Sequence, residues 1–523
     1  MVFFGFFTIG KRSHALASLW LAAASLFFYG WWDIRFVSLL LASIVFNYSA
    51  GYLIGRKVDV SQSVSQSVSQ SKTLLFSAIA VNLILLGYFK YANFFVHNIN
   101  QLANTSLFIG EVALPLGISF FTFTQIAFLV DTYQGKVKEF NFVRYTLFVT
   151  YFPHLIAGPV LHHKEMMPQF AKHDVCRLNQ QNVAVGLSIF VFGLAKKVLI
   201  ADSLAEFATP IFSVVTAGGH PMLFEAWIGA LAYTLQLYFD FSAYSDMAIG
   251  LSLMFNVRLP MNFNSPYKAT NIIDFWRCWH ITLSRFLRDY LYIPLGGSRH
   301  GKARRYINLM VTMLLGGLWH GAGWTFVIWG GLHGFYLMVN HAWRSFKEIM
   351  GWGEGGKLAK MAAGILTFVA VVVGWVFFRA ENTTVAMEML RGMAGLNGIS
   401  FSTKLGTTAF AAIMKNTGVQ FGGVMPLSDL SSGKAINILL LGLWVVFKLP
   451  NLRQLFQTYR PTCDEAISEY QSEEKGKKQS LQSIIVQKIK WRASREYAWA
   501  IGILFAIALL NLNHTSEFLY FQF

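Results

Sequence analysis

The chain reads Asp274-Phe275-Trp276-Arg277-Cys278-Trp279-His280 and then Gly316-Gly317-Leu318-Trp319-His320-Gly321-Ala322-Gly323-Trp324, which places two Trp-His pairs 40 residues apart. A third block follows as Trp329-Gly330-Gly331-Leu332-His333-Gly334. His320 lies in a segment apolar enough to enter a lipid bilayer. Because a titratable imidazole is costly in that setting, His320 is a functional candidate by default.

The composition is that of a membrane protein. Of the 523 residues, 54% are hydrophobic and 13% are charged, and the mean hydropathy is +0.45, whereas soluble domains carry about 25% charged residues. We therefore expect an all-α polytopic protein in the lipid bilayer, with one integral-membrane domain over residues 1–523. The net charge of +17 is explained by cationic cytoplasmic loops. Because these cations are scattered between apolar segments, we expect no nucleic-acid partner.

Apolar segments of about 20 residues are long enough to span a bilayer. They predict about 11 to 13 transmembrane helices near 14–31, 35–55, 73–91, 105–130, 142–160, 182–200, 222–242, 307–330, 361–378, 435–449 and 496–512, with short, broken or re-entrant stretches at 243–256, 326–343 and 405–424. C-terminal helices are thus expected within 435–523.

The composition of each loop indicates its character and its side of the membrane. A Val-Ser-Gln-Ser repeat predicts a flexible loop over 56–72. The Lys- and Arg-rich segments 285–305, 344–360 and 448–495 are assigned to the cytoplasm. Lys196 and Lys197 follow an apolar stretch and are interpreted as its cytoplasmic end.

Residues 280–293 predict an interfacial helix that ends at Pro294. Arg285 and Asp289 are spaced to pair at i,i+4. The basic turn that contains Arg299 is expected to lie in water.

The histidines suggest acid–base chemistry, with packing as the alternative for each. A neutral imidazole at His320 can take a proton from a hydroxyl acceptor, and the alternative is a hydrogen-bonded core histidine. His280 can bind a developing oxyanion, or it can be an interfacial histidine anchored between tryptophans. For His333, packing or hydrogen bonding is favoured over chemistry.

Other residues are candidates for the walls of a tunnel. The tryptophans supply broad apolar surfaces, and two acids, Asp240 and Asp246, lie in an apolar setting where bonding to polar partners is favoured over acid–base work. The predicted tunnel residues are Trp276, Trp279, Trp319, Trp324, Asp240, Tyr244 and His333. The motifs HExxH, GxSxG and the P-loop do not occur, so we expect no metal site, no serine-hydrolase site and no ATP-driven pump.

At these residues the chain resembles the bacterial branch of the membrane-bound O-acyltransferase family. The resemblance is carried in order by Leu114–Phe121, Phe152–Pro159, Tyr238–Asp246, Asn262–Tyr267, Phe275–His280, Asp289–Gly297, Trp319–Gly321 and the tail Ser516–Phe523. The family core falls within about 110–345. Many relatives have an arginine where this chain has Cys278.

The resemblance implies a helical bundle around a central tunnel, with the family's catalytic histidine at His320 and its second polar position at His280. It also implies O-acetylation of an extracytoplasmic polysaccharide such as alginate, with peptidoglycan or another envelope glycan as the alternative. Expected with it are the bacterial inner membrane and a periplasmic partner acetyltransferase of the SGNH type.

The expected donor is acetyl-CoA or another acyl thioester, used as a co-substrate with no bound cofactor. Its anionic end is expected near Arg285, Arg288 and Arg299. A transporter of acyl carriers or lipid-linked sugars is the rival from another class, and it predicts that conservative changes at His320 are tolerated.

Overall fold

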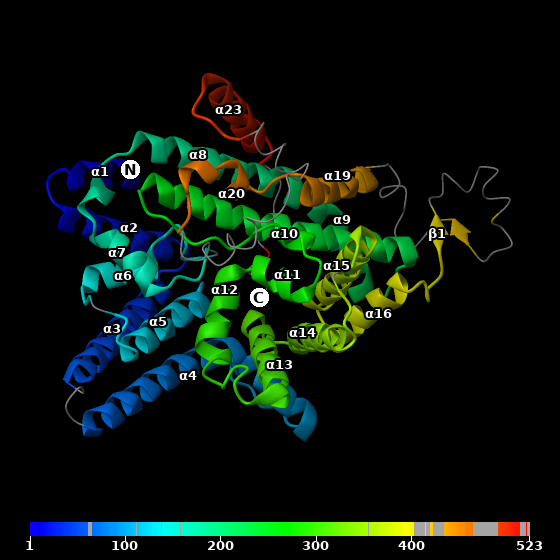
Figure 1. Ribbon diagram of the computed structural model, residues 1–523, viewed down its shortest axis with the longest axis horizontal. Coiled ribbons are helices and arrows are strands. Elements are labelled where there is room, and N and C mark those ends of the chain that lie inside the picture. The colour runs from blue at the N-terminus through cyan, green and yellow to red at the C-terminus, as the bar shows by residue number, and fades with distance from the viewer. Residues whose placement is uncertain are drawn as a thin grey trace.

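A computed structural model of the chain describes residues 1–60, 65–110, 112–137, 139–156, 158–353, 355–401, 414, 419–421, 434–463, 490–512 and 519. Helices make up nearly all of its regular structure (Figure 1). The first half contains α1 (Val2–Gly10), α2 (His14–Trp32), α3 (Arg35–Val60), α4 (Ser65–Ala103), α5 (Ile118–Tyr133), α6 (Phe142–Thr150), α7 (His163–Ala171), the 3-10 helix η1 (His173–Cys176), α8 (Gln180–Ala195), the π-helix η2 (Lys196–Ala201), α9 (Asp202–Thr216) and α10 (Leu223–Met254).

The second half begins after α10. It contains η3 (Pro266–Lys268), α11 (Ile272–Cys278), α12 (Ile281–Leu287), the π-helix η4 (Arg288–Tyr292), α13 (Gly301–His320), α14 (Trp324–Ile349), α15 (Lys357–Arg379), α16 (Thr383–Met393), α19 (Lys434–Lys448), α20 (Leu452–Leu455), η6 (Gln457–Tyr459) and α23 (Arg495–Leu510). Two short strands, β1 (Ser400–Phe401) and β2 (Gln420–Phe421), pair in parallel, with Ser400 opposite Gln420. No prediction covered this sheet.

The interior consists of two large apolar cores with α10 between them. One core is built mainly from α1–α8, and the other from α9–α19 with Trp279 and Trp329 among its buried rings. Helix α10 packs against α8, α9, α15, α16 and α19, and it runs through the middle of the molecule in Figure 1. The predicted all-α membrane class is confirmed.

Five helices in the described part of the chain are long and apolar enough to cross a membrane. They are His14–Trp32, Arg35–Val58, Ser69–Ala103, Gln180–Thr216 and Lys357–Arg379. Several other predicted spans are shorter than a full crossing, such as α5 with 16 residues and α19 with 15. At a rise of about 1.5 Å per residue, such helices are only about 24 Å long. They therefore cross only part of the bilayer, or the residues on either side of them complete the crossing.

Three predicted helices have different bounds in the structure. The span predicted at 105–130 begins only at Ile118, because Gly117 takes a left-handed φ of 69° and Pro115 precedes it. The span predicted at 142–160 ends at Thr150, ahead of Pro153. The span at 222–242 and the stretch at 243–256 form one helix, α10, of 32 residues.

The predicted loop at 56–72 is mostly helix, since α3 continues to Val60 and α4 begins at Ser65, and residues 61–64 lie outside the described residues. Most of the stretch at 405–424 also lies outside them. Helix α8 continues through η2 into α9, so Lys196 and Lys197 lie in the middle of a helical segment and do not mark its end.

The segment predicted as one helix at 307–330 is a hairpin of two helices. Helix α13 ends at His320, residues 321–323 are extended, and α14 returns alongside α13. The predicted close approach of glycine backbones is confirmed at Gly317, where an added Cβ would lie 3.1 Å from the Cα of Gly330. The hairpin therefore presents His320 at a helix end inside the protein.

Candidate functional site

The structure brings His280 and His320 together. Their ring centroids lie 6.4 Å apart, with the ring planes inclined at 65°. Both residues are buried, His280 fully and His320 to 9% exposure. His320 is the last residue of α13, and His280 is the residue immediately before α12. The start of α12 and the end of α13 thus place two imidazoles next to each other.

A strained backbone sets the direction of the His280 ring. His280 has φ 42° and ψ 55°, in the left-handed region that residues other than glycine rarely adopt. Asn262 holds the segment in place: its carbonyl accepts from the Ile281 N–H at 2.9 Å, and its Oδ1 accepts from the Thr282 hydroxyl at 2.6 Å. The Thr282 hydroxyl in turn accepts from the Val160 N–H at 2.9 Å. The surrounding structure therefore maintains a conformation that an isolated chain would leave.

Lys90 and Tyr91 of α4 hold the end of α13. The ammonium of Lys90 donates to the carbonyl of Trp319 and, at 3.2 Å, to that of His320. The Tyr91 hydroxyl donates to the carbonyl of Leu318 at 2.7 Å. The last carbonyls of a helix have no partner within it. A cation at this position is also stabilising, because it is attracted to the negative end of the helix dipole. Sequence reasoning missed Lys90, although a lysine near the end of the apolar run 73–91 was a visible signal.

Aromatic rings surround the histidine pair. The ring of His320 contacts Trp319 at 4.9 Å, Trp329 at 5.1 Å and Phe378 at 5.1 Å. Trp319 also faces His280 at 6.3 Å. Trp329 was expected as an apolar wall near His320, and Phe378 was missed as a site residue. These rings exclude water from the pair, and a dry setting strengthens hydrogen bonds and charge interactions within it.

His333 belongs to the same aromatic group but has a structural environment. It is fully buried, and its Nδ1 accepts a hydrogen bond from the Trp276 indole N–H at 3.3 Å. Trp329 lies between it and His320, 4.9 Å from the His333 ring. Trp279 packs behind His280 against Trp375 at 4.8 Å. The favoured interpretation of His333 as a packing and hydrogen-bonding residue agrees with these contacts.

A cavity of about 700 Å³ lies beside the His280 segment. Its wall includes Trp276 and Ile281, and its cations are Lys164, Arg277, Arg285 and Arg288. His162 also lines it; this side chain is 3% exposed, and its Nε2 has no hydrogen-bond partner among the described residues. A cavity of this size with several cations and one buried polar atom is suited to a phosphate-bearing ligand.

The arginines of this cavity differ in their partners. The guanidinium of Arg285 binds both carboxylate oxygens of Glu165, at 2.5 and 2.8 Å. Arg288 pairs with Asp289 at 2.8 Å and is half-exposed. The predicted pairing of Arg285 with Asp289 is therefore wrong, because Glu165 of α7 is buried against Arg285 and offers both of its oxygens. Arg299 is exposed and is not among the residues that line the cavity.

Three predicted tunnel residues lie elsewhere. Trp324 is 58% exposed and donates to Asn98 of α4 at 2.9 Å. Asp240 of α10 pairs with Lys197 of η2 at 2.6 Å, and Tyr244 lies under the same ammonium. The acids of α10 are thus bound to lysines of η2, as the preferred interpretation of the sequence had it. Among the described residues no group of three or more His, Cys, Asp or Glu could hold a metal ion.

Known proteins resemble the chain over most of its length. The sequence model of the MBOAT, membrane-bound O-acyltransferase, family matches residues 63–378. A peptidoglycan O-acetyltransferase of Helicobacter pylori is 46% identical over 429 residues, 76% of this chain and 78% of the relative. A probable alginate O-acetylase of Azotobacter vinelandii is 39% identical over 524 residues, 97% of this chain and 94% of the relative. A teichoic acid D-alanyltransferase of Bacillus subtilis is 24% identical over 274 residues, 51% of this chain and 69% of the relative.

Proposed function

The chain belongs to the membrane-bound O-acyltransferase family, and we propose that it moves an acetyl group from a cytoplasmic thioester to a hydroxyl acceptor for O-acetylation of an envelope polysaccharide. The observation that carries this proposal is the His280–His320 pair, buried among aromatic rings beside a cationic cavity. The enzyme class rules out a protein that only transports a carrier. Its several apolar helices make it a multi-pass membrane protein.

The proposed chemistry assigns one role to each histidine. A neutral imidazole has one nitrogen that accepts and one N–H that donates. His320 accepts the proton of the acceptor hydroxyl while the hydroxyl oxygen attacks the thioester carbonyl carbon. His280 donates a hydrogen bond to the carbonyl oxygen as its negative charge develops. The C–S bond then breaks, and the proton on His320 goes to the leaving thiolate.

The donor is proposed to enter through the cationic cavity. The positive-inside rule assigns this side to the cytoplasm, since the start of α13 carries Lys302, Arg304 and Arg305. Acetyl-CoA, or another acyl thioester with a phosphate-bearing arm, fits the charge of the cavity. Arg288 is the arginine best placed to bind the phosphates, because Arg285 already binds Glu165 with both ends of its fork.

The acceptor is proposed to be alginate or a similar polysaccharide, because the match to a probable alginate O-acetylase spans 97% of this chain. Peptidoglycan is the second candidate, favoured by the higher identity of 46% over a shorter alignment. Direct transfer to the glycan, or transfer by way of a hydroxyl on an SGNH-type periplasmic partner, uses the same site. All of the relatives named above are bacterial proteins, which supports a place in the bacterial cytoplasmic membrane.

The test is acetyl transfer from radiolabelled acetyl-CoA in inverted membranes that contain the wild type, His320→Ala or His280→Ala. We expect label in a glycan or a periplasmic protein with the wild type only, and separation of the labelled products identifies the acceptor. Equal labelling in all three membranes would refute the proposed roles of both histidines.

A further inference from the structure

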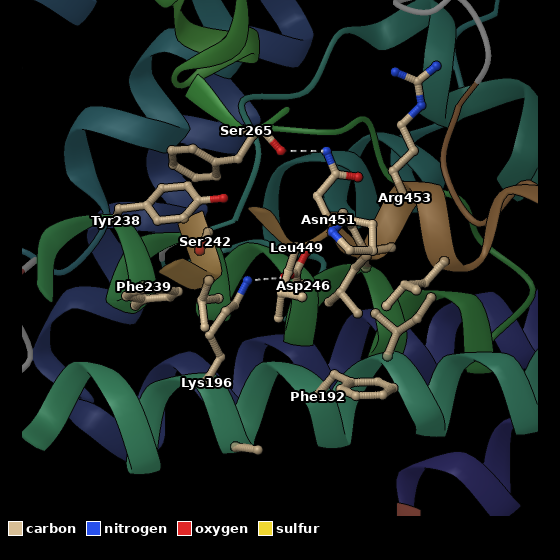
Figure 2. Close-up of a pocket in the computed structure, with 18 of the residues that line it drawn as sticks. Phe192, Lys196, Tyr238, Phe239, Ser242, Asp246, Ser265, Leu449, Asn451 and Arg453 are labelled. Carbon is tan, nitrogen blue, oxygen red and sulfur yellow. Dashed lines mark hydrogen bonds and ion pairs between the residues drawn. The ribbon is translucent and has the colours of Figure 1, made fainter. Parts of the chain in front are cut away.

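A second cavity of about 360 Å³ lies against α10 (Figure 2). It shares no lining residue with the cationic cavity. Its volume is within the range of small-ligand pockets. Its wall is mostly apolar and is formed by α8, η2, α10, the segment 261–265, the region from α19 to α20, and α23, including Ile189, Phe192, Ile249, Val445, Leu449 and Leu504.

A few polar groups stand in this apolar wall. Lys196 and Asp246 form an ion pair, which Figure 2 shows reaching across from η2 to α10. One turn before Asp246 lies Ser242, which is 2% exposed and whose hydroxyl has no hydrogen-bond partner among the described residues. A buried hydroxyl without a partner is destabilising unless a ligand or water satisfies it. Ser242 therefore points to a bound molecule that carries an acceptor.

The surroundings of the cavity are lipid-facing. Leu504 belongs to α23, which packs mainly along α8 and exposes Trp499 and Ile503. Helix α19 on the other flank exposes Leu440 and Trp444. Large apolar side chains on membrane helices face acyl chains, so the cavity lies between two surfaces that contact lipid.

The charges of the lining residues favour an anion. Lys196 and Arg453 supply two cations, against the single carboxylate of Asp246. In Figure 2 Arg453 lies apart from the ion pair, with its guanidinium directed away from it. Arg453 also belongs to the basic segment 448–495, which the positive-inside rule assigns to the cytoplasmic side.

We propose that this cavity binds an anionic glycerophospholipid of the cytoplasmic leaflet. One acyl chain lies along the apolar wall, and its ester carbonyl accepts a hydrogen bond from Ser242. The phosphate lies toward Arg453. This binding role goes beyond the proposed transfer chemistry.

The bound lipid supports the wall behind the His280 ring. Phe263 lines the cavity and packs against Trp279 at 5.1 Å and Phe241 at 4.9 Å. Phe241 in turn contacts the His280 ring at 4.8 Å. Filling the cavity restricts Phe263 and, through these rings, the position of His280.

The experiment is native mass spectrometry of the full-length chain, stripped of lipid in detergent and then titrated with a defined probe. The probes are phosphatidylglycerol, phosphatidylcholine with the same acyl chains, and inorganic phosphate. We expect phosphatidylglycerol to bind about tenfold more tightly than phosphatidylcholine, and inorganic phosphate not to be retained. Retention of inorganic phosphate alone would overturn the lipid assignment.

The variants locate the site. Ser242→Met fills the cavity and is expected to abolish the preferential binding, whereas Arg453→Gln weakens it about tenfold. Arg492→Gln removes the same charge from an exposed residue that does not line the cavity, and binding is expected to be unchanged. Equal binding by Ser242→Met and the wild type would overturn the proposal.

A second measurement uses the wild type alone and does not depend on whether a variant folds. A phosphatidylglycerol with a photoactivatable group in its acyl chain is expected to label peptides of α8, α10 and α19. Label confined to other helices would place the bound lipid elsewhere and refute the assignment of this cavity.

Discussion

Two regions near α10 contain buried polar side chains, and the surroundings of these side chains differ: they are oppositely charged groups in one region and aromatic rings in the other. Where η2 faces α10, Lys197 binds Asp240 at 2.6 Å and Asp202 at 2.7 Å, and Lys196 binds Asp246. At the histidine site, the two imidazole rings contact each other and the rings of Phe241, Trp319, Trp329 and Phe378. In the first region each charge contacts an opposite charge, with Lys197 shared by two carboxylates, whereas the second region places two imidazoles among aromatic rings.

The difference separates structural from functional polarity in a membrane protein. A buried charge pair that is fully matched is strongly disrupted when one partner is removed, but replacing the whole pair by apolar residues is often tolerated. A buried site for chemistry is expected to respond in the reverse way, with loss of activity and little loss of stability. Each prediction below tests one side of this contrast.

The largest effect is expected at His320. Replacing it by Gln keeps a polar side chain of similar size but removes the base, so the transfer rate should fall at least about a thousandfold. The melting temperature of the purified protein should change little. Initial rates and a thermal melt on the same preparation provide the check. A loss of stability comparable to that of a charge-pair variant would place His320 among the structural residues.

The next largest effect is expected in the lysine–aspartate cluster. Lys197→Met leaves two carboxylates without their ammonium, which destabilises the fold by about 3–5 kcal/mol. Adding Asp240→Leu should recover part of that loss, because it removes the more buried of the two carboxylates, whereas Asp202 still lacks the Lys197 ammonium. Thermal melts of the three proteins measure both steps. If the single and the double variant melted alike, charge matching would not explain this interface.

A smaller effect is expected at Lys90, a charged residue of α4 that lies at the histidine site. Lys90→Met removes the donor to the Trp319 and His320 carbonyls, so the end of α13 should shift and kcat should fall about tenfold to a hundredfold with little change in KM. Lys90→Arg should restore part of the rate. Lys72→Met, at an exposed position of the same helix, is the control. A rise in KM without a fall in kcat would contradict a positioning role.

The smallest effect is expected in the cationic cavity. Arg288→Gln should raise the KM for acetyl-CoA about threefold to tenfold, and added salt should reduce the difference from the wild type. Arg299→Gln should leave KM unchanged, because Arg299 does not line the cavity. Arg285→Gln should instead lower the melting temperature, since it strands Glu165, whose side chain is 1% exposed. Steady-state kinetics and melts distinguish the three arginines.

The candidate site was predicted from sequence where the signal is local. His280 and His320 stand out because a histidine within an apolar run is unusual, and the resemblance assigned both to one site. Lys90 and Phe378 were missed because they lie 230 and 58 residues from His320 in the chain. Only the tertiary structure brings Lys90 of α4 and Phe378 of α15 to His320 at the end of α13. The same reason explains why Glu165 was not foreseen as the partner of Arg285.

Composition and apolar run lengths by themselves determined that this chain is helical and membrane-embedded, and they predicted basic loops on the cytoplasmic side. Those properties depend on whether each segment is more stable in lipid or in water, and this follows from the hydrophobicity and charge of the segment itself. The tertiary structure decided where helices break, which acid binds which base, and which tryptophans surround the histidines. Trp319 and Trp324 look alike in the sequence, yet one is buried against His320 and the other is exposed beside Asn98. Residues five apart point in different directions on helical backbone, and the break after His320 separates them further.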